Sequence, residues 1–149
     1  MYIEKKIKQL EDLKKQIPNQ VKIIANNNKK QLLDYIRIKQ LFEKGIDGLG
    51  NVLGVYKNTY DGDGRGYPKI KGTRFNFFDT GSLTNKMDLF VTDQYTLAVF
   101  STDAKYPELI EEYPNMFLYT IENIKEIESE IFLKQLYEWM IKTPAFTQI

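Results

Sequence analysis

The first seventeen residues place apolar side chains with the period of an α-helix. The apolar positions follow one another at steps of 4, 3, 3 and 4 and are Ile3, Ile7, Leu10, Leu13 and Ile17. This spacing predicts an amphipathic helix with one apolar face. We expect Pro18 to end or kink it, because proline has no N–H for the helical hydrogen bond.

A second helical pattern follows, up to about residue 44. Its apolar positions are Val21, Ile24, Ala25, Leu32, Leu33, Ile36 and Phe42. The run Asn26, Asn27 and Asn28 favours a break within it, since asparagine competes with helical hydrogen bonds. Gly45 stands where a helix would end, and we expect it to form the structural turn there.

Residues 45–105 change to glycines and short apolar runs. Residues 52–56 and Phe75, Phe77 and Phe78 predict short strands, the second one ended by a structural turn at Asp79, Thr80 and Gly81. Gly81 suits a positive φ in that turn. Between the two strands, residues 57–72 hold four glycines, one proline and four basic residues. We expect this segment to be an exposed, mobile loop.

The clearest hairpin pattern lies at residues 86–101, where two apolar runs flank a turn. A three-residue loop at residues 92–94 would pair Met87 with Val99, Leu89 with Leu97 and Val91 with Tyr95. One face of the hairpin would then be entirely apolar.

The last part, residues 106–149, is predicted to be helical. A short helix opens at Tyr106, and Thr120 is a good N-cap for a long final helix that Pro144 stops. The order of elements predicts one α+β domain over residues 1–149, a small curved antiparallel sheet packed against N-terminal and C-terminal helices.

Composition excludes several classes of chemistry. The 149 residues include no cysteine and no histidine, which removes disulfides, cysteine nucleophiles, the Ser-His-Asp triad and nearly all zinc sites. We expect no cofactor, no metal site and no enzymatic activity. The sequence has no apolar run long enough for a membrane span and no secretory signal.

Charge is unevenly distributed although the net value is +1. Residues 1–44 carry eleven basic and five acidic residues, residues 45–105 seven of each, and residues 106–149 three basic and eight acidic. A chain that is basic at one end and acidic at the other can pair its own ends or pair head to tail with copies of itself.

We consider three functions for the segment 57–72: a calcium loop, a phosphate-binding loop and a contact surface. Asp61 and Asp63 resemble the start of a calcium loop, but Gly72 stands where a bidentate glutamate is required. The glycines do not complete a phosphate-binding loop. The basic and aromatic residues fit contacts in an oligomer or with nucleic acid, two readings that the sequence leaves open. They are Tyr60, Arg65, Tyr67, Lys69, Lys71 and Arg74.

Three blocks together resemble the virion-morphogenesis proteins of tailed phages. The first runs from Gln40 to Tyr56 and contains the step Phe42-Glu-Lys-Gly45-Ile-Asp47. The second is Gly72-Thr-Arg-Phe75-Asn-Phe77-Phe-Asp79-Thr80-Gly81-Ser-Leu83, followed by Lys86-Met87. The third is Phe117-Leu-Tyr-Thr120, before the last helix.

This resemblance, over about residues 36–140, implies a structural protein of the head–tail connector, neck or tail-completion group. Such proteins form rings that link the portal or adaptor to the tail around the double-stranded genome. The chain would then be a virion protein, assembled in the host cytoplasm. Its partners would be copies of itself and phage portal, adaptor and tail proteins, without a membrane and with only non-specific proximity to DNA.

Two alternatives come from other functional classes. A small nucleic-acid-binding protein would use the basic first 44 residues, with Lys29, Lys30 and Arg37 as the candidates that face DNA. A carboxylate-based hydrolase would use Glu108 or Glu111, although a solvated helix face explains these glutamates better.

Overall fold

The computed structural model describes residues 1–61, 68–77 and 81–147 and has the expected α+β architecture. The N-terminal helices are α1 (Tyr2–Asn27), α2 (Lys29–Asp34) and the π-helical η1 (Tyr35–Phe42). The hairpin region holds α3 (Ser82–Asn85), β1 (Met87–Val91) and β2 (Leu97–Ser101). The C-terminal elements are α4 (Tyr106–Glu112), α5 (Ile121–Ile127), the π-helical η3 (Glu128–Leu133), α6 (Lys134–Met140) and α7 (Pro144–Thr147).

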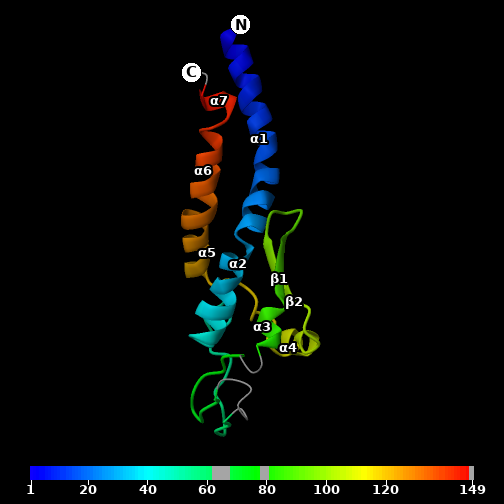
Figure 1. The fold of residues 1–149 in the computed structure, drawn as a ribbon, viewed down its shortest axis with the longest axis vertical. Helices are drawn as coiled ribbons and strands as arrows, with labels where there is room; N and C mark the ends of the chain where they lie inside the picture. Colours follow the sequence, from blue (N-terminus) through cyan, green and yellow to red (C-terminus); the bar gives the residue numbers. More distant parts are fainter. Residues whose placement is uncertain (62–67, 78–80, 148–149) are drawn as a thin grey trace.

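The molecule is elongated, with both termini at one end (Figure 1). Helix α1 runs antiparallel beside α6 and α7, and the hairpin lies beside the lower end of α1 and beside α2 in this view. The irregular segment after η1 occupies the end opposite to the termini. The buried core gathers where α1, α2, η1, the hairpin and the last helix meet, around Leu32, Ile36, Leu41, Met116 and Ile131.

Helix α1 does not end at Pro18, contrary to one of the two expected outcomes, and continues to Asn27. Leu13 before the proline and Ile24 after it are both buried. Packing of this face against the C-terminal helices therefore offsets the hydrogen bond that proline cannot make. The break expected at the asparagines is confirmed, since Asn28 separates α1 from α2 and its side-chain amide donates to the Ile24 carbonyl at 2.8 Å.

The hairpin forms, but its predicted register is wrong. Met87 pairs with Ser101, Leu89 with Val99 and Val91 with Leu97. The turn is longer than expected, because Tyr95 adopts a φ of 57° and the Thr92 N–H donates to the Thr96 carbonyl at 2.9 Å. The shift is two residues, so the apolar side chains stay on the predicted face, where Met87 and Leu89 are buried.

The other two predicted strands are reduced to single bridges. Val55 pairs with Arg74 and Ile46 with Val52, and within residues 1–61, 68–77 and 81–147 the sheet has two strands. Positive φ values at Gly54 (152°) and Phe77 (54°) interrupt the extended backbone. The sheet is therefore smaller than the sequence pattern indicates, whereas the fold class is as expected.

The C-terminal boundaries follow the sequence pattern closely. Helix α4 begins at Tyr106, and the Thr120 hydroxyl caps α5 by accepting the Asn123 N–H at 3.2 Å. The final helix passes through the π-helical η3 and ends at Met140. Pro144 then begins α7, at the first helical position, where its missing N–H costs nothing.

Candidate functional site

The two described stretches of the arm at residues 57–72, which are 57–61 and 68–72, are joined by hydrogen bonds. The N–H groups of Tyr60 and Lys69 donate to each other's carbonyls at 2.7 and 2.8 Å. The Lys71 N–H donates to the Thr59 hydroxyl at 3.2 Å. At the base of the arm, Arg74 donates from Nη1 to the Lys44 carbonyl at 3.1 Å.

Four of the six predicted contact residues lie on this arm or at its base: Tyr60, Lys69, Lys71 and Arg74. Arg65 and Tyr67 lie outside the described residues. Tyr60 and Lys71 are exposed, whereas the Lys69 ammonium lies 5.7 Å from the centre of the Tyr56 ring. The arm also exposes Ile70, so it presents both charge and apolar surface to its surroundings.

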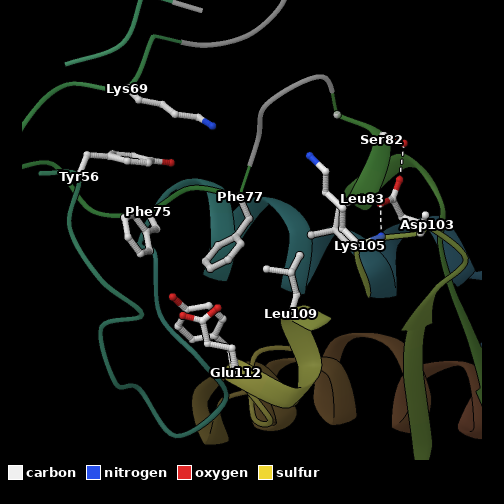
Figure 2. Close-up of a pocket in the computed structure, with 13 residues that line it drawn as sticks. Tyr56, Lys69, Phe75, Phe77, Ser82, Leu83, Asp103, Lys105, Leu109 and Glu112 are labelled. Carbon is white, nitrogen blue, oxygen red and sulfur yellow. Dashed lines mark hydrogen bonds between the residues drawn. The ribbon is translucent and has the colours of Figure 1, made fainter. Parts of the chain in front are cut away.

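A pocket of about 570 Å³ lies between the arm and helices α3 and α4 (Figure 2). Aromatic rings form much of its wall: the Phe77 ring centre lies 6.0 Å from that of Phe75 and 5.5 Å from that of Tyr113. Lys69 stands on the arm side, while Lys105 and Asp103 stand across from it (Figure 2). The pocket is thus an apolar hollow with charged groups dispersed around its rim.

The Asp103 carboxylate in this wall is engaged in local structure. It accepts hydrogen bonds from the Ser82 hydroxyl and from the Lys105 N–H at 3.0 Å, and the Lys86 ammonium lies 3.5 Å away. The Ser82 hydrogen bond, more than the others, lowers the pKa of Asp103 below its usual value. Sequence reasoning missed this residue, although Asp two positions before Lys105 is the pattern of an Asx-turn.

The glutamates considered for hydrolysis face solvent. Glu108 and Glu111 are exposed on α4, and neither lines the pocket, whereas their neighbour Glu112 does. Among the described residues no group of three or more acidic side chains is placed to hold a metal ion.

Two of the three cations considered for DNA contact are paired within the chain. The Lys29 ammonium lies 2.8 Å from the Asp88 carboxylate of β1, and Arg37 pairs with Asp34. Lys29, ahead of the Leu89 N–H, lowers the pKa of Asp88. Lys30 is exposed, and the ion pairs within the part of the chain that the structure describes do not include it.

An ion pair also joins the basic N-terminal region to the acidic C-terminal region. The Lys39 ammonium of η1 lies 3.0 Å from the Glu126 carboxylate of α5 and 4.1 Å from the centre of the Tyr35 ring. This pairing lowers the pKa of Glu126 and raises that of Lys39.

The structural turns adopt the backbone expected of them where the structure describes them. Gly45 has a φ of 61° and Gly81 a φ of 79°. A Cβ atom at Gly45 would lie 2.4 Å from the Phe75 carbonyl oxygen, so both conformation and space require glycine there. Gly81 precedes α3, and Asp79 and Thr80 lie outside the described residues.

The three sequence blocks that carry the phage resemblance meet at one junction. Gly48 of the first block lies against Leu118 of the third, so closely that an added Cβ would be 2.4 Å from the Leu118 Cβ. Gly45 of the first block contacts Phe75 of the second. Segments that are far apart in the chain therefore pack together at this junction.

The buried side chain of Gln40 connects η1 to the segment around Leu118 and to α5 by hydrogen bonds. It is 1% exposed, and its Nε2 donates to the Leu118 carbonyl at 2.9 Å. Its Oε1 accepts the Thr120 N–H at 3.0 Å and the Asn123 amide at 2.7 Å. Sequence reasoning did not single out Gln40, since a glutamine on a helix is ordinarily a surface residue.

The chain exposes more surface than a compact monomer of its size. Its accessible surface is 9897 Å², against about 7,900 Å² expected for a folded monomer of this mass. Large apolar side chains stand exposed on separate elements: Ile3, Ile7 and Leu10 on α1, Leu49, Val55 and Ile70 near the arm, and Leu133 and Tyr137 on the last helix. None of the described helices combines the length and the apolar character that crossing a bilayer requires.

Comparison with protein-family models, with curated proteins and with solved structures finds no match to this chain.

Proposed function

We propose that this chain is a structural subunit of a ring at the bacteriophage head–tail junction, a neck, connector or tail-completion protein. In that role it would link the portal or adaptor to the tail around the DNA channel. The three sequence blocks resemble those of this group of proteins. Their packing against one another, at the junction of Gly48, Phe75 and Leu118, supports the resemblance.

The observation that carries the proposal is the apolar surface left exposed on elements far apart in an elongated molecule (Figure 1). Exposed apolar side chains that share one helix face, as Ile3, Ile7 and Leu10 do on α1, form the kind of apolar surface that marks contacts with other proteins. The accessible surface of the chain exceeds that of a compact monomer of the same mass by about 2,000 Å². A typical stable interface buries about 800 Å² on each partner. A ring subunit has two such interfaces, one with each neighbour.

The distribution of charge suits the same role. Closing a ring requires one face of a subunit to complement a different face of the next. The basic first 44 residues and the acidic last 44 supply two faces of opposite sign. The arm at residues 57–72, with its exposed Tyr60, Lys71 and Ile70, reaches toward a neighbour or an adjacent ring.

The proposal is tested by electron microscopy of the purified protein, alone and after mixing with the portal and tail proteins of the same phage. We expect annular particles in at least one of the two samples. The matched control contains the portal and tail proteins without this chain. A protein that stays monomeric in both samples, and that is missing from purified virions, would refute the proposal.

A further inference from the structure

An apolar stripe on α1 continues beyond the element that covers it. The stripe follows the steps 4, 3, 4, 3 and 4 of a coiled-coil seam, with Lys14 at its fourth position and apolar residues at the others: Ile3, Ile7, Leu10, Ile17 and Val21. At its lower end Val21 lines a 450 Å³ apolar cavity shared with the hairpin residue Leu97 and with Leu136. The hairpin thus packs against this side of α1 only near the C-terminal end of the helix.

The N-terminal half of α1 extends past the tip of the hairpin (Figure 1). There α7 and α6 cover a neighbouring face, on which Leu13 is buried and the Lys6 ammonium donates to the Ala145 carbonyl at 2.9 Å. The stripe itself stays open, with Ile3 65% and Ile7 52% exposed. It therefore lacks the packing partner that the hairpin provides further down.

The last helix carries a second open stripe. Leu133, Tyr137 and Ile141 are exposed at positions i, i+4 and i+8, which share one helix face. The face toward the N-terminal helices is a different one, since Ile131 is buried and Gln135 exchanges hydrogen bonds with Asn28 at 2.9 and 3.1 Å. The second stripe consequently points away from α1.

The two stripes match in length and differ in charge. From Ile3 to Leu10 the helix rises about 10 Å, and from Leu133 to Ile141 about 12 Å. Residues 1–27 carry six lysines and three acidic residues, whereas residues 121–147 carry five glutamates and three lysines.

Each stripe also has one charged residue in line with its apolar side chains, and the two charges are opposite. Lys14 follows Leu10 by four residues in the first stripe, and Glu130 precedes Leu133 by three residues in the second. Both side chains are exposed. Opposite charges in line with the two apolar stripes favour pairing of one stripe with the other over pairing of either with itself.

We propose that the Ile3–Ile7–Leu10 stripe of one copy packs against the Leu133–Tyr137–Ile141 stripe of the next copy. The contact is heterologous, so each subunit uses one stripe toward each neighbour, and repetition closes a ring or extends a filament. This inference deepens the proposed function and rests on it for the closure of the ring.

Cross-linking between two single variants tests the pairing directly. The natural chain has no cysteine, so Ile7→Cys and Tyr137→Cys, carrying tags of different mass, can be mixed and oxidised without background. We expect a mixed disulfide between the two variants. The matched control replaces Ile7→Cys by Lys8→Cys, one residue along α1 on its polar face, and should cross-link at least about tenfold more slowly.

A second measurement uses Ile7→Glu with Gln16→Glu as its control. Both side chains are exposed within the subunit, so the fold should survive, as circular dichroism would verify. Each variant adds one negative charge to α1, but Gln16 lies on the side of the helix away from the stripe. We expect Ile7→Glu to weaken self-association by at least about tenfold in light scattering, and Gln16→Glu to weaken it much less.

The outcomes separate this inference from the proposed function. Annular particles without the mixed disulfide, or with Ile7→Glu assembling normally, would overturn the pairing and leave the ring intact. A mixed disulfide in open filaments would keep the pairing and remove the ring. Disulfides between two Ile7→Cys chains alone, or no association of the natural chain, would also overturn the pairing.

Discussion

At the scale of single residues, the junction where Gly48 packs against Leu118 requires glycine because there is no room for a side chain, and not because of hydrophobicity. Gly48 donates its N–H to the Asn115 carbonyl at 2.9 Å and lies directly against Leu118. Gly50, two residues away, has a φ of 82° but no atom within 4 Å of the place where a Cβ would stand. One turn thus holds two glycines needed for different reasons, space and conformation.

The pair permits a matched prediction. Gly48→Ala should lower the free energy of unfolding by about 2–3 kcal/mol, because the new methyl group overlaps the Leu118 backbone. Gly50→Ala should cost only about 1 kcal/mol, from the positive φ alone. Urea unfolding monitored by circular dichroism measures both, and equal losses would contradict the assigned contact with Leu118.

At the scale of elements, tertiary packing explains why α1 continues through Pro18. The helix continues through Pro18 because Leu13 and Ile24 on the same face are buried against other helices. A segment of this composition has no reason to stay helical across a proline in isolation. The burial of these side chains therefore offsets the free energy that is lost with the missing hydrogen bond.

We expect Pro18→Ala to raise the free energy of unfolding by about 1–3 kcal/mol, since it restores an N–H for the Lys14 carbonyl. The exposed neighbour Asn19 is the control, because Asn19→Ala changes only helix propensity and should add about 0.5 kcal/mol. Thermal and urea unfolding provide the comparison. A Pro18→Ala gain no larger than that of Asn19→Ala would mean that the helix does not pass through residue 18 as described.

At the scale of the whole molecule, two ion pairs join the basic N-terminal helices to the rest. Lys29 reaches Asp88 of β1, and Lys39 reaches Glu126 of α5. Both carboxylates have a pKa below the ordinary value, through their lysine partners first. Their contribution to stability is therefore complete above the pKa of the unfolded chain and is lost as pH falls through the folded pKa.

We accordingly expect the unfolding midpoint to stay level from about pH 7 to about pH 5.5 and to fall below about pH 4.5. Asp88→Asn should cost about 0.5 kcal/mol at neutral pH, the scale of a half-exposed pair, and nothing at low pH. Asp12→Asn is the control, because Asp12 faces Lys15 at 3.9 Å with both side chains in solvent. A loss for Asp88→Asn that persists unchanged at low pH would contradict the role of the charge.

The sequence pattern alone was sufficient wherever one short stretch of chain decides the outcome. The break at Asn28, the cap at Thr120, the start of α4 at Tyr106 and the positive φ of Gly81 all depend on neighbours within a turn. The apolar face of the hairpin was predictable as well, because alternation survives a register shift of two residues.

Only the tertiary structure decided the features that depend on distant segments. The hairpin register follows from the turn around Tyr95. Lys29, a candidate for DNA contact in the alternative hypothesis, pairs with Asp88 of the distant strand β1. The sequence also could not tell that the apolar stripe on α1 is covered near Val21 and open at Ile3. Periodicity shows which side chains share a face, whereas the length of the hairpin and the packing of the last helix determine which part of that face remains exposed.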